Sequence, residues 1–355
     1  MPAMRQPIEG PFNWKAADVT RDESWIHHFT TAEQAEIDAG LRHALAKGAT
    51  LPTLTAQDFP LPTVSERFAQ GREMLENGIG MQLYRGIDVT RYSKDELRLM
   101  YWAFGLHLGT PVSQSMNGDV LGDVRNLNTD LDGPQGRGYT TNRKLNCHTD
   151  SCDVVGLFVL RTAKSGGASR LASSVAVHNE MLRLRPDLLE VMYEPFAWSW
   201  QGQEPSGADP WYPQPIFTTY RGKFSCRFVS THIKSAQRYE DAPRITQQQQ
   251  EALELFETLS NDPVFSYAMM FEPGDMQLLN NHVTLHARTD FADYEEPDRR
   301  RHLLRMWLSV PNSRPLNPQL GYIYRNLQGG SVRGGFPSRT GKYVHETRLG
   351  AAMLD

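Results

Sequence analysis

The tripeptide His148-Thr149-Asp150 offers an imidazole and a carboxylate two positions apart. In an extended segment, residues i and i+2 project from the same face, so these two side chains can converge on one ion. A second imidazole from elsewhere in the chain would complete a 2-His-1-carboxylate set, which leaves coordination positions open and suits non-haem Fe(II) chemistry with O2. Three-residue matches are common by chance, so a surface His beside an Asp is the ordinary alternative.

Two further histidines, His282 and His286, are candidates for that second imidazole. Their spacing of four residues would suggest a zinc pair on a helix, but the helical zinc motif carries Glu after its first His, where this chain has Val283. Val283 and Thr284 favour a strand, on which positions 282, 284 and 286 share a face. The segment is therefore predicted to be a strand rather than a zinc-binding helix.

A run of three arginines ends at Arg301, and Arg305 follows four positions later. Such a run is usually a solvated charge patch, but these two arginines enter an apolar segment, 303–310. On an alternating strand they share a face with Leu303 and Trp307. A guanidinium that points into a barrel needs an anion, and a carboxylate bound in bidentate geometry is the natural one.

In their order along the chain, these features resemble the taurine dioxygenase-like (TauD/TfdA) family of Fe(II)- and 2-oxoglutarate-dependent oxygenases. The resemblance spans residues 148 to about 310, and the N-terminal part supports it more weakly. It implies a double-stranded β-helix (jelly-roll) core. The segments that carry it are His148-Thr149-Asp150, Gly166-Gly167-Ala168-Ser169, the Gly274-Asp275 turn ahead of a distal His286, and the arginines Arg301 and Arg305.

The resemblance implies that His148, Asp150 and His286 ligate Fe(II) and form the catalytic centre. 2-Oxoglutarate and O2 would be cosubstrates, with succinate and CO2 released as a C–H bond of the substrate is oxidised. Hydroxylation is favoured over halogenation because related halogenases lack the carboxylate that Asp150 supplies, while desaturation, ring formation and bond cleavage stay open. His282 would then lie beside the metal ligands or pack in the core.

The resemblance also implies how the other substrates bind. Arg301 matches the arginine that grips the distal carboxylate of 2-oxoglutarate, because its spacing to Arg305 is that of the family. Ser169 stands where the family has a Thr whose hydroxyl assists the same carboxylate. Arg305 matches the arginine that holds the sulfonate in taurine-oxidising members, which implies an anionic substrate such as a carboxylate, sulfonate or phosphonate. Alternatively, Arg305 pairs with a structural acid such as Asp275.

Local patterns predict helices first and then many short strands, the order expected of a sandwich or barrel buttressed by helices. The expected fold class is mainly β with flanking helices. Residues 1–355 are predicted to form a single oxygenase domain, with a helical buttress (1–117), an active-site loop (118–146), a jelly-roll core (147–310) and a C-terminal extension (311–355). The expected helices are 30–48, 65–77, 93–109 and 246–259, and the expected strands are 79–84, 154–160, 216–220, 224–229, 265–271, 276–279, 283–287 and 302–310.

Composition argues against several classes of protein. The 355 residues carry 37 Lys+Arg against 41 Asp+Glu, a net charge of −4, so nucleic acid is not an expected partner. No apolar run reaches the roughly 20 residues of a membrane span, and residues 1–14 do not resemble a secretory signal. Cys147, Cys152 and Cys226 match no disulfide framework or zinc pattern and predict reduced thiols in a cytoplasmic protein. The expected partner is a small-molecule substrate, and a homo-oligomer stays open.

Two alternatives of other classes stay open. The chain could be a jelly-roll module that only binds a metal, or a zinc-dependent hydrolase, in either case without 2-oxoglutarate turnover. Arg301 and Ser169 favour the oxygenase, because a mere binder has no need of a 2-oxoglutarate clamp, and no general base is evident beside the metal. Succinate formation that depends on 2-oxoglutarate would separate the oxygenase from both.

Overall fold

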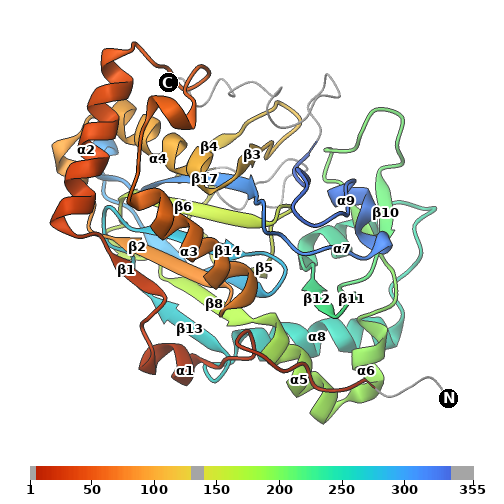
Figure 1. The fold of residues 1–355 in the computed structure, drawn as a ribbon. Helices are drawn as coiled ribbons and strands as arrows, with labels where there is room; N and C mark the ends of the chain where they lie inside the picture. The colour runs from red at the N-terminus through yellow and green to blue at the C-terminus, as the bar shows by residue number, and fades with distance from the viewer. Residues whose placement is uncertain (1–4, 129–139, 337–355) are drawn as a thin grey trace.

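The computed structural model describes residues 5–128 and 140–336 (Figure 1). Two larger β-sheets are accompanied by three two-stranded sheets, and helices flank both sides. More of the described residues lie in helices than in strands. The fold therefore contains both helices and strands in quantity, and the expectation of a mainly β protein underestimated the helices. The helices are α1 (Ala16–Arg21), α2 (Thr31–Ala46), α3 (Val64–Asn77), α4 (Lys94–Leu108), α5 (Ser174–Leu184), α6 (Pro186–Val191), α7 (Ser230–Ala236), α8 (Gln247–Asn261) and α9 (Gly321–Tyr324).

The large sheet has seven strands in the order β1-β2-β14-β6-β17-β3, with β4 also paired to β17. Its central pairs, β14 with β6 and β6 with β17, are antiparallel. β17 therefore contacts β6 along one edge and both β3 and β4 along the other. Its strands are β1 (Ile26–His28), β2 (Met81–Arg85), β3 (Thr110–Val112), β4 (Leu121–Val124), β6 (Val154–Arg161), β14 (Met276–Asn280) and β17 (His302–Ser309).

The small sheet has four strands in the order β13-β8-β15-β5, all antiparallel. Three further pairs, β9 with β10, β11 with β12 and β7 with β16, lie outside both sheets. The strands of the small sheet are β5 (Leu145–His148), β8 (Ser169–Ser173), β13 (Ser266–Met269) and β15 (Thr284–Arg288). The remaining strands are β7 (Ser165–Gly166), β9 (Phe196–Ser199), β10 (Trp211–Gln214), β11 (Phe217–Tyr220), β12 (Lys223–Cys226) and β16 (Phe291–Ala292).

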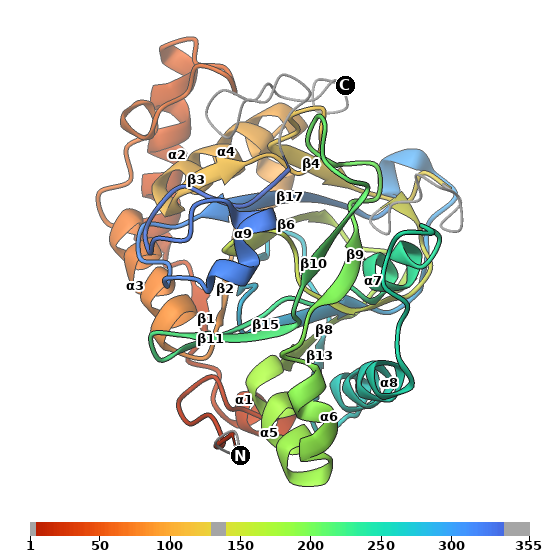
Figure 2. The same ribbon diagram turned by 90° about the vertical axis from the view of Figure 1, so that its right-hand side faces the viewer.

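The large sheet divides the hydrophobic core because successive side chains of a strand face opposite ways. Leu303 of β17 belongs to a buried cluster that includes Leu171 and Leu285 of the small sheet. Leu304, the next residue, belongs to a second cluster that includes Phe104 of α4. In Figures 1 and 2 the helices α2, α3 and α4 gather beside the large sheet, whereas α5, α6 and α8 lie at the opposite end of the molecule, near β8 and β13. The small sheet therefore packs between the large sheet and the later helices.

The three predicted N-terminal helices are confirmed as α2, α3 and α4, and two of them begin at the expected capping boxes. Thr30 and Glu33 form the capping box of α2, and Ser93 and Glu96 form that of α4. In each box the Ser or Thr hydroxyl accepts the N–H of the third helical residue, and the Glu carboxylate accepts the N–H of the cap.

Two expectations about the middle of the chain are wrong. The segment 118–146 is not simply a loop, because Leu121–Val124 forms β4 and pairs with β17; residues 129–139 of that segment lie outside the described residues. The helix 246–259 was also the one helix expected among the later strands, but three more, α5, α6 and α7, precede it. In α5 the β-branched Val175 and Val177 suggest a strand, but Ser173 caps a helix by accepting the N–H of Ala176.

The chain beyond β17 packs against the body of the protein as far as residue 336. Arg314 forms an ion pair with Glu76 of α3 at 3.0 Å, and Arg333 forms one with Asp153 at 2.8 Å. All four side chains are nearly inaccessible to solvent. Within residues 5–128 and 140–336, every helix is too short or too polar to cross a lipid bilayer.

We expect Leu304→Ala to lower the free energy of unfolding by about 2–5 kcal/mol, because the fully buried side chain packs against the N-terminal helices and its truncation leaves a cavity. Leu45→Ala, at a position of α2 that is 45% exposed, is the matched control and should change that free energy by less than about 0.5 kcal/mol. Urea unfolding followed by circular dichroism measures both. Equal losses would contradict the placement of Leu304 in the core.

Candidate active site

The structure brings together His148, Asp150 and His286, which are far apart in the sequence. His148 ends β5 and His286 lies directly opposite it on β15, so the two imidazoles occupy one face of the small sheet with ring centroids 4.2 Å apart. Asp150 follows β5, and its Oδ2 is 3.6 Å from Nε2 of His286. One ligand atom from each of the three residues lies within 4.8 Å of the other two. This is the geometry of a three-ligand metal site.

Asp150 is held by residues from both sides of the site. Its backbone N–H donates to Oδ1 of Asn281 at 2.8 Å, and its Oδ2 accepts the indole N–H of Trp307 at 2.9 Å. Trp307 lies on β17 of the large sheet, whereas His286 lies on the small sheet. The three-residue group therefore lies between the two sheets, where neighbouring side chains fix the carboxylate.

The backbone around Asp150 is held by Arg227, which sequence reasoning did not identify. The Arg227 guanidinium donates to the carbonyl oxygen of Thr149 at 2.8 Å and to Oγ of Ser151 at 2.9 Å. The Thr149 hydroxyl accepts the N–H of Phe228 at 3.0 Å, so the middle residue of the motif faces away from the ligand atoms. No local pattern could identify Arg227, because its partners lie more than 70 positions away in the sequence.

The charges of the three residues suit a divalent cation. Burial lowers the pKa of His148, and burial together with His148 lowers that of His286 to about 3, so both imidazoles are neutral at pH 7. Nδ1 of His148 bonds to the carbonyl of Asn146 at 2.8 Å, which leaves Nε2 to face the group. Burial alone would raise the pKa of Asp150, but the positive charge of Arg305 and the Trp307 N–H hold it below its ordinary value. Two neutral imidazoles and one carboxylate match an Fe(II) site with open positions.

Arg301 lies in a buried pocket together with Gly167, Phe271 and Leu303. Only 4% of the residue is exposed, and its Nη1 has no hydrogen-bond partner among the described residues. Burial lowers the pKa of Arg301 to about 9, and the nearby positive charge of Arg288 adds to this effect. A buried guanidinium without a carboxylate partner is costly, so this pocket is suited to an anion.

Two further predicted site residues, Ser169 and Arg305, each form a hydrogen bond to a glutamine side chain. Ser169 is buried on β8, where its hydroxyl donates to Oε1 of Gln277 at 3.3 Å. Arg305 lies on β17 beside Trp307, and its Nε donates to Oε1 of Gln114 at 2.6 Å.

Asp275 is not the partner of Arg305. The carboxylate of Asp275 accepts two hydrogen bonds from Arg85, at 2.7 and 2.8 Å. The alternative in which Arg305 pairs with Asp275 is therefore wrong. His282 packs in the core, where its Nε2 bonds to Asp153 at 2.9 Å and its ring lies against Tyr324.

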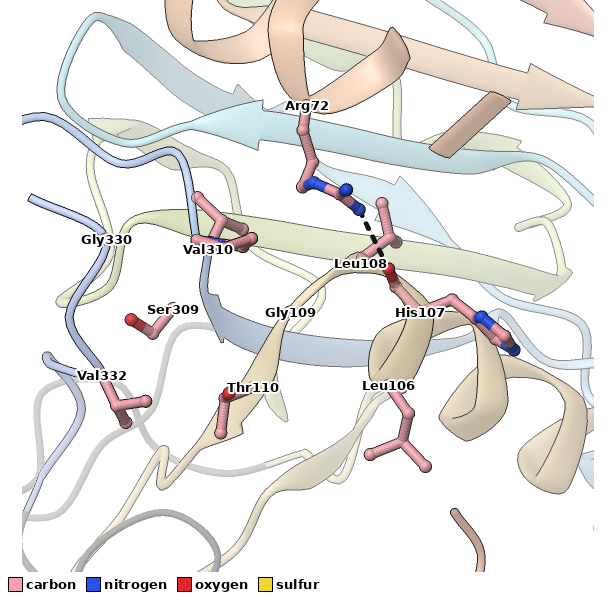
Figure 3. Close-up of a pocket in the computed structure, with 11 residues that line it drawn as sticks. Arg72, Leu106, His107, Leu108, Gly109, Thr110, Ser309, Val310, Gly330 and Val332 are labelled. Carbon is pink, nitrogen blue, oxygen red and sulfur yellow. Dashed lines mark hydrogen bonds between the residues drawn. The ribbon is translucent and has the colours of Figure 1, made fainter. Parts of the chain in front are cut away.

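A pocket of about 260 Å³ lies elsewhere (Figure 3). It is lined by Arg72 of α3, the C-terminal end of α4, the start of β3 and the end of β17, and its lining shares no residue with the metal group or the Arg301 pocket. Its charged side chain, Arg72, donates to the carbonyl of His107 at 2.9 Å and so caps the C-terminal end of α4. This pocket offers no cluster of metal ligands, and the candidate active site stays between the sheets.

Comparisons with known proteins agree with this geometry. The model of the taurine catabolism dioxygenase TauD, TfdA family matches residues 47–307. The chain belongs to this family. FR-33289 synthase from Streptomyces rubellomurinus is 32% identical over 314 residues, which cover 88% of this chain and 93% of that protein. A taurine hydroxylase-like protein from Stachybotrys chartarum is 27% identical over 82% of this chain and 77% of that protein. A crystal structure of asparagine oxygenase has the same fold, with a TM-score of 0.63 at 16% identity over 84% of this chain and 98% of that chain.

This TauD/TfdA protein is an Fe(II)- and 2-oxoglutarate-dependent dioxygenase that oxidises a C–H bond of a small organic molecule and releases succinate and CO2. Fe(II) is its cofactor, and 2-oxoglutarate and O2 are its cosubstrates. Family membership confirms the prediction made from the motif order and sets aside the binding-module and zinc-hydrolase alternatives.

We expect Trp307→Phe to weaken Fe(II) binding about tenfold, because the substitution removes the N–H that orients the Asp150 carboxylate. That N–H also helps to hold the pKa of Asp150 down, so in the variant the carboxylate takes up a proton at higher pH. Fe(II) should therefore be lost at a higher pH on acidification than in wild type. Anaerobic Fe(II) titration at several pH values measures both effects.

Trp25→Phe is the matched control, since the buried Trp25 indole N–H bonds to the carbonyl of Val19 rather than to a site residue. Its Fe(II) affinity and pH profile should match those of wild type. A Trp307→Phe protein that also matched wild type would contradict a role of this N–H in holding Asp150.

Proposed function

We propose that this oxygenase binds Fe(II) through His148, Asp150 and His286 and binds 2-oxoglutarate through Arg301 with assistance from Ser169. We further propose that it hydroxylates a small anionic substrate held by Arg305. The observation that carries the proposal is the convergence of two neutral imidazoles and a carboxylate within 4.8 Å, between two sheets. Bound Fe(II) would activate O2, which is the oxidant, and 2-oxoglutarate would supply two of the four electrons that O2 accepts. The protein residues supply orientation and exclude water.

The buried cation of Arg301 supports the cosubstrate assignment. A 2-oxo acid can chelate a metal through its C1 carboxylate and C2 ketone, which leaves the distal carboxylate of 2-oxoglutarate to reach a separate cation. Arg301 offers Nη1 without a hydrogen-bond partner among the described residues, and the residue is buried. A carboxylate there would gain a charge-assisted hydrogen bond in a low-dielectric setting. Ser169 stays a prediction, with its hydroxyl placed to donate to Gln277 or to a ligand.

Arg305 supports an anionic substrate. Its guanidinium is close enough to the metal group to lower the pKa values of Asp150 and of both histidines. Its Nε donates to the neutral amide of Gln114, so this hydrogen bond brings no negative charge to the guanidinium. The name of one relative refers to taurine, whose sulfonate is an anion of the kind that a guanidinium binds.

We also propose the finer architecture. The large and small sheets would form a double-stranded β-helix (jelly-roll) core, and residues 1–355 would form a single domain. In support, one buried cluster contains side chains of both sheets and includes residues from Trp14 to Phe336. Cys147, Cys152 and Cys226 are buried free thiols, and a cytoplasmic location stays a prediction.

We expect Arg301→Met to weaken 2-oxoglutarate binding about 100-fold and to leave Fe(II) binding unchanged, because the distal carboxylate loses its cation. His286→Ala should instead abolish Fe(II) binding, because it removes one of the three ligands. The measurement is an anaerobic titration with Fe(II) and then 2-oxoglutarate, followed by the visible charge-transfer band of the chelated 2-oxo acid. Arg300→Met is the matched control, since the Arg300 side chain donates to main-chain carbonyls outside the pocket. A wild-type protein that bound Fe(II) but gave no band would refute the assignment.

We expect Arg305 to restrict the substrate to anions. Succinate release measured over a panel of small sulfonates, phosphonates, carboxylates and their neutral amides should rise only with anionic members. Arg305→Met should lose that stimulation about 100-fold, whereas Arg305→Lys, which keeps the charge, should retain part of it. Neutral compounds that stimulate wild type and Arg305→Met equally would count against the proposal.

A further inference from the structure

Arg288 is a buried cation near the proposed 2-oxoglutarate pocket that the proposed function does not use. It lies two residues beyond His286 on β15, and 6% of the residue is exposed. Its Nη2 donates to the carbonyl oxygens of Thr141 at 2.7 Å and Arg143 at 2.5 Å, while its Nε has no partner among the described residues. Within the same residues, no carboxylate forms an ion pair with it. Its hydrogen bonds are therefore to neutral carbonyls, and its charge is not neutralised by them.

Arg288 and Arg301 share an aromatic neighbour. The guanidinium carbon of Arg288 is 4.7 Å from the ring centroid of Phe291, and that of Arg301 is 5.1 Å from the same centroid. The two positive charges consequently lie close to each other in a buried setting. A ring face attracts each cation but cannot cancel its charge.

One carboxylate, that of Asp293, acts on both arginines. Its Oδ1 accepts the backbone N–H of Arg301 at 2.8 Å, and its Oδ2 has no described hydrogen-bond partner. Burial lowers the pKa of Arg288 to about 10 and that of Arg301 to about 9, and Asp293 opposes the shift in both. Within residues 5–128 and 140–336, these two guanidiniums and this carboxylate sum to an excess of one positive charge beside the pocket that Arg301 lines.

A single negative charge would balance that excess. Any 2-oxo acid carries the carboxylate and ketone that chelate a metal, so 2-oxo acids differ in what they present at the far end. The distal carboxylate of 2-oxoglutarate supplies one negative charge there, whereas an alkyl end would leave the excess positive charge uncompensated.

We propose that Arg288 is a specificity-determining residue whose charge, added to that of Arg301, makes the pocket select 2-oxo acids with a second carboxylate over those with an apolar end. The inference rests on the proposed binding of 2-oxoglutarate at Arg301. Arg288 acts on the ligand through the electrostatic potential of the pocket and at the same time holds residues 141 and 143 in place.

The test compares two ligands that differ at the far end. Fe(II)-loaded protein is titrated anaerobically with 2-oxoglutarate and with 2-oxopentanoate, and the charge-transfer band gives a dissociation constant for each. Arg288→Gln removes the charge but keeps an amide that can donate to the Thr141 carbonyl. We expect it to weaken 2-oxoglutarate binding about tenfold and to change 2-oxopentanoate binding less than about threefold. Arg288→Lys, which keeps the charge, should retain most of the preference for 2-oxoglutarate.

A second variant tests the effect of charge on the preference for 2-oxoglutarate in the opposite direction, because it removes a negative charge. Asp293→Asn removes the local negative charge and keeps the Oδ1 acceptor for the Arg301 N–H, so it should increase the preference for 2-oxoglutarate over 2-oxopentanoate. If Arg288→Gln does not fold, this variant alone shows whether the local charge sets the preference for 2-oxoglutarate. Arg300→Gln is the matched control and should leave both dissociation constants unchanged, because its side chain bonds to the carbonyls of Tyr294 and Glu295.

The outcomes separate this inference from the proposed function. Equal weakening of both ligands in Arg288→Gln would show a merely structural role and overturn the inference, as would an unchanged preference in Asp293→Asn. A wild-type protein that gave a band with neither ligand would overturn the binding of 2-oxoglutarate itself. Opposite shifts of the preference in the Arg288→Gln and Asp293→Asn proteins would establish the charge of the pocket as the determinant.

Discussion

The hydrogen bond from the Trp307 indole to the Asp150 carboxylate joins the two sheets at the site. His148 and His286 face each other across neighbouring strands of the small sheet, so their convergence requires that sheet alone. The orientation of Asp150 additionally requires β17 of the large sheet, because Trp307 belongs to it. The proposed ligand set is therefore complete only when both sheets pack, and the contacts that position β17 also position Asp150.

Buried positive charge is the second constraint. Arg227, Arg288 and Arg301 are each at most 6% exposed, and within the described residues none of them forms an ion pair with a carboxylate. Arg227 donates its hydrogen bonds to the backbone and side chains that flank Asp150. Near Arg288 and Arg301 a single carboxylate, that of Asp293, opposes two cations. A pair of buried cations that is only partly compensated is unfavourable for folding, and such a cost is typical of a site that an anionic ligand completes.

The sequence predicted those parts of the site that depend on local periodicity. His148 and Asp150 were found through the period of a strand, and the capping boxes located the ends of α2 and α4. Arg227 and Arg288 could not be found this way, because the carbonyls they hold lie 78 and 147 positions away and carbonyls carry no residue-type signal. The helices α5 and α7 were missed for a related reason: burial between other elements overrode weak local preferences.

The alternating pattern correctly predicted which side chains of β17 share a face. Arg301, Leu303, Arg305 and Trp307 were expected on one face, and Arg301 and Leu303 do line one pocket while Arg305 stacks on Trp307. The intervening residues face the N-terminal helices: His302 bonds to Asp123, which pairs with Arg98 of α4, and Leu304 and Met306 join the helix-facing core. A one-residue slip of β17 would exchange the two sets and place guanidiniums in the apolar cluster. The packing of α4 against the outer face of the strand thus fixes the register that presents the cations and Trp307 to the site.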